Sequence, residues 1–381
     1  MVLKRPLHCP TKVMESEAFE TTVGEIVDGR RWALVTSAFW NTSDKVARLI
    51  EAAGPPAVAV TDVKPNPVLS DVIVLADWLG DAELIVALGG GSVMDIAKAI
   101  AALNGMVDGE AILVAHLTEG AQLPDAMTPK PIVAVPTTSG TGSEVTPWGT
   151  IWGDDGIKFS VNDTKLYPSH AILDAHLCLT MPRDLTLATG LDALSHAMES
   201  IWNQRHMALT DALATEAITI IRASLEKAIT HPGELQTRAS MQTAAILSGL
   251  AMGTTQTALA HSISYPFTSR YGLPHGLACA FTLPEIARFN GETEPDRLAP
   301  IAAALGCPIG AIPAELETWF DALGVGELLT RFVSPAVADE LGDNLITRAR
   351  AANNIRDVDG AMARRIARAA LERFCAKTAP E

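Results

Sequence analysis

The sequence has few cysteines and little positive charge, and each shortage excludes a class of protein. The five cysteines among 381 residues are widely scattered with no Cys-x-x-Cys pair, which indicates neither a disulfide framework nor a thiolate zinc site. Lys and Arg total 29 against 44 Asp and Glu. The resulting net charge of −15 argues against nucleic-acid and anionic-membrane partners.

Long apolar runs are missing as well. No segment reaches the length of an uninterrupted membrane span, and residues 1–10 contain no apolar stretch of signal-peptide length. We therefore expect a cytoplasmic protein without a membrane partner. The composition that remains, 48% hydrophobic and 19% charged, is typical of a globular chain, and the length suggests two domains.

Apolar runs and helical patterns alternate in the first part of the chain. The runs at residues 31–37, 56–61, 82–88 and 131–136 are typical of buried parallel strands, with helical patterns at 44–53 and 69–79. From residue 183 onward helical patterns dominate, at residues 186–203, 208–230, 235–252, 312–323 and 357–374. The pattern predicts an α/β domain with a Rossmann-like parallel sheet at residues 1–180 and an all-α domain at 181–381.

Two loops rich in glycine and hydroxyl groups follow predicted strands. Gly90, Gly91 and Ser92 open a predicted helix, whose N-terminus can hold a pyrophosphate, although a Gly triplet can also be a tight turn. The second loop, residues 137–146, is better interpreted as a solvated polar loop when it is taken by itself. Because open α/β sheets bind ligands at the carboxyl ends of strands, the two loops together favour a shared nucleotide crevice.

Asp192 and His196 are four residues apart in a predicted helix, so their side chains share one face. A carboxylate and an imidazole at this spacing can bind one divalent cation, and His261 and His275 could complete the site. An amphipathic helix with an ordinary buried polar pair explains the spacing equally well.

Together these motifs resemble the iron-dependent (group III) alcohol dehydrogenase family, whose two-domain architecture is shared with dehydroquinate synthase-like enzymes. The matching segments occur in the family's order between about residues 60 and 280. They are Lys64-Pro65-Asn66-Pro67, residues 89–98, 136–146, Leu173-Asp174, Thr180-Met181-Pro182, residues 189–199 and residues 272–276.

The resemblance implies a role for each matching residue. Asp192, His196, His261 and His275 correspond to the ligands of a divalent metal, for which Fe²⁺ and Zn²⁺ are equally suitable by ligand chemistry. Lys158 corresponds to a lysine that faces the active-site crevice. The implied cofactor-binding residues are Asn66, Gly90, Gly91, Ser92, Asp95, Thr137, Thr138 and Ser143.

The implied reaction is hydride transfer between a nicotinamide and a small aldehyde or primary alcohol, with the metal as Lewis acid. We expect a homodimer with a small-molecule substrate. A dehydroquinate synthase-like lyase is the rival enzyme class, and a non-catalytic nucleotide-binding protein is the third reading.

Two positions depart from the common family pattern. NAD-preferring relatives usually carry Asp where this chain has Ser37, and the loss of that carboxylate predicts a preference for NADP(H) over NAD(H). Tyr265 replaces a histidine suspected of proton transfer in many relatives. Its phenol could relay a proton or could only pack in the core.

The segment that follows Tyr265 is similar to the subgroup that reduces phosphonoacetaldehyde to 2-hydroxyethylphosphonate. A dianionic substrate needs cations beside the metal, and Arg270, Lys158 and Lys165 are the candidates, although each could be an ordinary surface cation. A general short-chain alcohol or diol dehydrogenase of the same family is the alternative.

Overall fold

The computed structural model describes residues 6–104, 106–343 and 345–375. Within them the chain separates into two units, which we describe one at a time. The α/β unit consists of the described residues of 9–138 and 142–178, and the helical unit contains residues 6–8, residues 139–141 and the described residues from 179 onward. An α/β part followed by a helical part is the predicted fold class, which is confirmed. The domain boundary at residue 180 stays a prediction.

A six-stranded parallel sheet is the centre of the α/β unit, with strand order β1-β8-β5-β4-β2-β3. A two-stranded antiparallel ribbon, β6-β7, is separate from it. The strands are β1 (Lys12–Glu15), β2 (Trp32–Thr36), β3 (Val58–Val60), β4 (Leu84–Gly89), β5 (Ile132–Pro136), β6 (Trp148–Trp152), β7 (Lys158–Asn162) and β8 (His170–Leu173).

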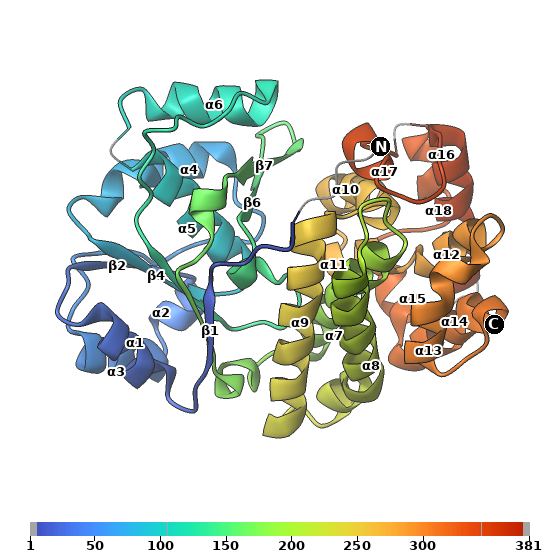
Figure 1. The fold of residues 1–381 in the computed structure, drawn as a ribbon, viewed down its shortest axis with the longest axis horizontal. Helices are drawn as coiled ribbons and strands as arrows, with labels where there is room; N and C mark the ends of the chain where they lie inside the picture. The colour runs from blue at the N-terminus through green and yellow to red at the C-terminus, as the bar shows by residue number, and fades with distance from the viewer. Residues whose placement is uncertain (1–5, 105, 344, 376–381) are drawn as a thin grey trace. The chain divides into compact units, whose positions relative to one another are not determined.

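Helices cover both faces of this sheet, which explains why its central strands are continuous apolar runs. Along β2, Trp32 and Leu34 belong to the core under α1 and α3, whereas Ala33 and Val35 belong to the core under α4, α5 and α6. Figure 1 shows α1 and α3 on one side of β2 and β4, with α4 and α6 on the other. The helices are α1 (Phe19–Val27), α2 (Ala38–Asn41), α3 (Asp44–Ala53), α4 (Leu69–Ala76), α5 (Gly91–Leu103) and α6 (Gly109–Glu119).

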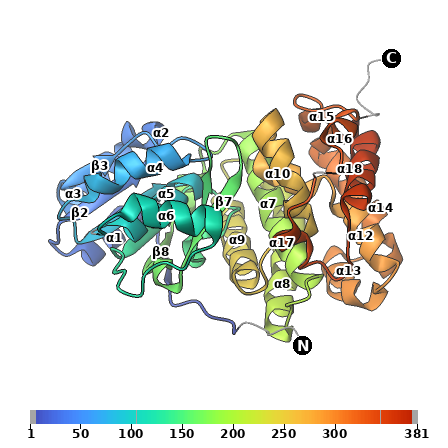
Figure 2. The same ribbon diagram turned by 90° about the horizontal axis from the view of Figure 1, so that it is seen from above.

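The helical unit is organised around α7 (Arg183–Ile201), which lies beside α8 (Ala208–Thr230) and α9 (Leu235–Thr255) (Figures 1 and 2). Every side chain from residue 190 to residue 201 of α7 is buried, as expected of a helix enclosed on all sides. The remaining helices are α10 (Leu259–Tyr271), α11 (His275–Ala280), α12 (Leu283–Gly291), α13 (Ala299–Leu305), α14 (Ile312–Leu323), α15 (Val325–Leu329), α16 (Val337–Leu341), α17 (Arg348–Ala351) and α18 (Gly360–Cys375).

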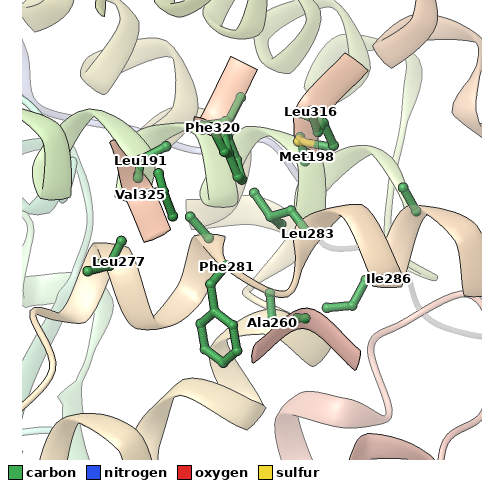
Figure 3. Packing of buried hydrophobic residues seen from close by; sticks show 14 of the residues in the cluster. Leu191, Met198, Ala260, Leu277, Phe281, Leu283, Ile286, Leu316, Phe320 and Val325 are labelled. Atoms are coloured by element: carbon green, nitrogen blue, oxygen red, sulfur yellow. The ribbon is translucent and has the colours of Figure 1, made fainter. Parts of the chain in front are cut away.

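One apolar core joins these helices. Leu191 and Met198 of α7 belong to the same buried cluster as Phe281, which follows α11, and Phe320 of α14 (Figure 3). Because the core fixes α7 against α10 and α11, it also fixes the polar side chains that these three helices carry.

A membrane-spanning helix was not expected, and among the described residues no single helix is both long and apolar enough to cross a membrane. Only the consecutive segments Pro295–Leu305 and Ile309–Leu323, bent by 78° at their junction, meet the criteria of length and composition as a pair.

Candidate metal and nucleotide sites

Four predicted metal ligands converge inside the helical unit. Asp192 and His196 come from α7, His261 from the first turn of α10, and His275 is the first residue of α11. The rings of His196 and His261 stack with centroids 4.7 Å apart, and the ring of His275 meets that of His261 edge-on at 5.4 Å. Asp192 Oδ1 lies 3.8 Å from His196 Nε2 and 3.6 Å from His261 Nε2.

The chemistry of this cluster fits a divalent cation. Asp192 Oδ1 and His261 Nε2 are both buried and have no hydrogen-bond partner among the described residues, and their separation of 3.6 Å is too long for a hydrogen bond. Two ligands at metal distances of roughly 2.1 Å in tetrahedral geometry lie about 3.4 Å apart. A shared cation would therefore satisfy both atoms, whereas leaving each one buried and unpaired is costly.

The cluster also holds its carboxylate ionised. Burial alone would raise the pKa of Asp192, but the positive charge that His196, His261 and His275 carry when protonated holds that pKa well below its usual range, and a bound cation would supply the same charge once the histidines are neutral ligands. A carboxylate that stays charged at neutral pH is a suitable ligand for a hard or borderline cation.

Glu199 orients His261 from the side away from the other ligands, and this role was not predicted from the sequence. Its Oε2 accepts a hydrogen bond from His261 Nδ1 at 2.6 Å, and its carboxylate also accepts the backbone N–H groups of Ala258 and Ala260. With Nδ1 occupied in this way, Nε2 of His261 faces the cluster as an acceptor. The available signal was spacing, since Glu199 follows Asp192 by seven residues, two helical turns on the same face.

Cys279 is a second residue that sequence reasoning missed at this site. It is completely buried, and its Sγ lies 3.8 Å from His275 Nε2. One ligand atom each from Asp192, His261, His275 and Cys279 all lie within 4.8 Å of one another. Cys279 follows His275 by four residues, which places both on one face of α11.

Gly276 allows α11 to approach α7 closely. A Cβ atom at this position would lie 1.9 Å from the carbonyl oxygen of Ala188 and 2.7 Å from Cβ of Asp192. Only glycine therefore fits at position 276, and this close contact between α11 and α7 places His275 near Asp192.

The two other predicted site residues of α10 lie at different distances along the helix from His261. Tyr265 follows His261 by one turn, is half-buried, and stacks on His275 with ring centroids 6.4 Å apart and an interplanar angle of 18°. Arg270 is exposed in the last turn, about 13 Å from His261 by helical rise. The structure thus brings Tyr265 to the cluster and leaves Arg270 at the helix end.

In the α/β unit, the two predicted nucleotide loops lie side by side. Strand β4 ends at Gly89 and α5 begins at Gly91. The N-terminus of this 13-residue helix therefore lies at the carboxyl end of the strand. The neighbouring strand β5 leads to Thr137, whose N–H bonds to the carbonyl of Gly89. A Cβ at Gly90 would lie 3.2 Å from the side chain of Thr138, so glycine keeps this cradle open.

Three further predicted cofactor residues are near the same end of the sheet. Ser37 follows the last residue of β2 directly and occupies the N-cap position of the short helix α2, without a capping hydrogen bond from its side chain. Asn66 has a left-handed backbone, with φ of 56°, and its N–H donates to Ser92 Oγ. Ser92 is thereby connected to the loop that the motif Lys64-Pro65-Asn66-Pro67 forms.

The fully buried Lys98 lies beside two predicted cofactor contacts, Asp95 and Ser143. It was not among the predicted site residues. Lys98 Nζ donates to Ser143 O, Ser143 Oγ and Trp148 O at 2.6–2.7 Å, and Ser143 Oγ donates to Asp95 Oδ1. Burial lowers the pKa of Lys98 to about 8 against the opposing effect of Asp95 and Glu144. Burial raises the pKa of Asp95 to about 6, and Lys98 and Lys158 oppose that rise.

The two predicted lysines are engaged differently. Lys158 is half-buried in β7, with Nζ 5.9 Å from the centre of the Trp152 ring. The exposed Lys165 donates to the backbone carbonyls of Asp125 and Met127. These bonds indicate that Lys165 fixes the loop that contains Asp125 and Met127.

The sequence matches two family models. Residues 10–175 match the model described as iron-containing alcohol dehydrogenase, and residues 186–332 match that of the C-terminal part of the Fe-containing alcohol dehydrogenase family. Together the matches cover most of both units.

Individual relatives agree with these matches. The chain is 36% identical to phosphonoacetaldehyde reductase of Streptomyces viridochromogenes over 309 residues, covering 77% of this chain and 74% of the relative. It is 32% identical to NAD-dependent methanol dehydrogenase of Bacillus methanolicus over 286 residues, 74% of each chain. The solved structure of sulfoacetaldehyde reductase from Bifidobacterium kashiwanohense in complex with NAD⁺ superposes with a TM-score of 0.87 at 28% identity, covering 96% of this chain and 98% of the other.

Proposed function

This chain belongs to the iron-containing alcohol dehydrogenase family, and from that membership we propose which residues perform the reaction and which aldehyde is reduced. The protein is an NAD(P)-dependent, metal-dependent oxidoreductase of small alcohols and aldehydes, and the lyase reading is disfavoured. The observation that carries the residue assignment is the pair of buried, unpartnered atoms Asp192 Oδ1 and His261 Nε2.

Asp192, His196, His261 and His275 hold the divalent cation. When bound, the cation acts as a Lewis acid that polarises the aldehyde carbonyl, and the nicotinamide supplies the hydride. Glu199 keeps His261 in the tautomer that presents Nε2 to the cation.

Tyr265 supplies the proton that the product oxygen needs after reduction. Its position one turn after His261, with its ring parallel to that of His275, supports this role. A tyrosine that only packs there would leave the pH dependence of the rate unchanged when replaced by phenylalanine, whereas a proton donor would change it.

The nicotinamide cofactor binds at the loops of the α/β unit. The N-terminus of α5 with Gly90, Gly91 and Ser92 holds the pyrophosphate, while Asn66, Asp95, Thr137, Thr138 and Ser143 hold the rest of the nucleotide. Lys158 faces the same crevice and lies close enough to Asp95 for its charge to oppose the rise in the pKa of that carboxyl group.

Ser37 directly follows β2 and lacks the carboxylate that would repel a 2′-phosphate, so we infer a preference for NADP(H) over NAD(H). The ratio of kcat/KM with NADPH to that with NADH should exceed one and should fall in Ser37→Asp, which restores the repulsive charge. A strong preference of the unmodified enzyme for NADH would contradict this inference.

The proposed substrate is phosphonoacetaldehyde, reduced to 2-hydroxyethylphosphonate. Two similar proteins are named as reductases of acetaldehydes that carry an anionic phosphonate or sulfonate group. Lys158 is the preferred cation for the anionic group. Arg270 is a weaker candidate because it is exposed at the far end of α10, and Lys165 is weaker because its ammonium group already bonds to two carbonyls.

Initial rates with NADPH after reconstitution with Fe²⁺ or Zn²⁺ test this substrate. We expect a higher kcat/KM for phosphonoacetaldehyde than for propanal, which has no anionic group to bind. A higher kcat/KM for propanal or a diol-derived aldehyde would instead support a general short-chain alcohol or diol dehydrogenase, a function that one relative, 1,3-propanediol dehydrogenase of Klebsiella pneumoniae, carries in its name.

A further inference from the structure

A sulfur atom lies among the donors of the metal cluster. Cys279 shares the inner face of α11 with His275, and its side chain is fully buried. Its Sγ belongs to a compact group with Asp192, His261 and His275, in which all donor atoms lie within 4.8 Å of one another. These four residues offer one oxygen, two nitrogens and one sulfur.

The distances suit a shared cation. Metal–nitrogen and metal–sulfur bonds of about 2.1 and 2.3 Å at a tetrahedral angle place N and S about 3.6 Å apart. Cys279 Sγ is 3.8 Å from His275 Nε2 and 3.9 Å from His275 Nδ1, so the sulfur is at ligand distance from Nε2, and the His275 ring has to turn to direct the Nε2 lone pair toward a shared cation. The sulfur is therefore as close to its neighbouring histidine as two ligands of one cation are.

Two other donor atoms of this group lack a hydrogen bond. Asp192 Oδ1 and His261 Nε2 are buried atoms without a hydrogen-bond partner among the described residues, and they belong to the group that contains Cys279 Sγ. A cation bound to these two atoms lies within reach of the sulfur.

We propose that Cys279 Sγ is a ligand of the metal in this chain in addition to Asp192, His196, His261 and His275, which gives the centre a donor set of one oxygen, three nitrogens and one sulfur. The proposal rests on the metal centre proposed above. On binding, the S–H bond breaks, a metal–sulfur bond forms, and the proton passes to solvent, with no change in oxidation state. Because thiolates favour zinc over iron among divalent ions, Cys279 shifts the preference of the site toward zinc.

Cobalt substitution tests the proposal without relying on turnover. The holoprotein is stripped with a chelator and reloaded with Co²⁺, and its spectrum is recorded for the sulfur-to-cobalt charge-transfer band in the near ultraviolet. We expect the band in the unmodified protein and in Cys178→Ser, a matched control at another fully buried cysteine, and its loss in Cys279→Ser and Cys279→Ala. In competition between Zn²⁺ and Fe²⁺, both Cys279 variants should lose zinc preference by roughly tenfold or more.

The outcomes separate this proposal from the proposed function. A protein that binds one Co²⁺ without the band, or a band that persists in both Cys279 variants, would overturn sulfur ligation and leave the four-ligand metal centre standing. Failure of the unmodified protein to bind Co²⁺, Zn²⁺ or Fe²⁺ would overturn both. Two variants are used so that a folding defect in one does not decide the result.

Discussion

At the scale of single residues, the chemistry depends on side chains that orient other side chains. His261 presents Nε2 to the cluster because Glu199 accepts its Nδ1–H, and Ser143 is fixed because Lys98 donates to its hydroxyl and its carbonyl. Neither Glu199 nor Lys98 was selected from the sequence, because a buried charged residue is visible only once its partners are known.

Replacement of Glu199 by Gln should weaken metal binding by about 10–100-fold, the range typical for residues that support a metal ligand. The amide retains the volume but loses the charge that holds His261 in one tautomer. Chelator competition measures the metal affinity, and circular dichroism checks the fold. The matched control is Glu144→Gln, a buried glutamate of the α/β unit, which should leave metal affinity unchanged. Equal affinity in Glu199→Gln and the unmodified protein would remove its positioning role.

Lys98→Met should destabilise the α/β unit by about 3–5 kcal/mol, because Asp95 and two carbonyls lose their buried partner. The sign of the pH dependence follows from the pKa of Lys98, which falls from 10.5 to about 8 on folding. Between these values the unfolded chain holds a proton that the folded chain has released, so this group adds stability as pH rises.

The difference in melting temperature between the unmodified protein and Lys98→Met should therefore widen from pH 8 to pH 10. Scanning calorimetry measures these melting temperatures. Lys12→Met, at an exposed lysine, is the control, and its melting temperature should differ from that of the unmodified protein by a small amount that does not change with pH. A difference in melting temperature between the unmodified protein and Lys98→Met that narrows from pH 8 to pH 10 would contradict the lowered pKa of Lys98.

At the scale of secondary structure, the metal cluster depends on three helices meeting at close range. The narrowest contact is between α11 and α7, where Gly276 faces the backbone of Ala188. The helix α7 and the position of Asp192 and His196 on one of its faces could both be predicted from the sequence. The meeting of α7 with α10 and α11 was available only through the family resemblance, because periodicity carries no information about contacts between helices.

Gly276→Ala should force α11 away from α7, lower stability by roughly 1–3 kcal/mol and weaken metal binding. Thermal melting and metal titration measure the two effects. Gly291→Ala provides the control, since its nearest neighbouring atom would be 3.8 Å from the new Cβ and a helical alanine is favourable. Retention of full metal affinity in Gly276→Ala would show that the contact does not position His275.

The strands show the same limit of sequence reasoning. The apolar run that became β4 is buried on both faces and was easily recognised. Strand β1 is the short exposed stretch Lys12–Glu15 at the sheet edge, with two charged and two apolar side chains, and it was not predicted. Pairing with β8 makes β1 a strand, and that pairing is not visible in its composition.

At the scale of the whole molecule, the two units carry different parts of the proposed reaction. The metal donors all lie in the helical unit, and the proposed nucleotide-binding residues all lie in the α/β unit. The order of the motifs along the chain was sufficient to predict this division of roles. The choice of substrate and cofactor depends on single residues such as Ser37, whose effect composition does not determine.

The central claim is that Asp192, His196, His261 and His275 form the metal centre that supports turnover. The direct test is metal content together with NADPH-dependent aldehyde reduction, measured on the unmodified protein and on His275→Ala after reconstitution with Fe²⁺ or Zn²⁺. We predict one metal ion per chain and active enzyme in the first case, and greatly reduced metal content and activity with a retained fold in the second. His275→Ala with full metal content and full activity would contradict the claim.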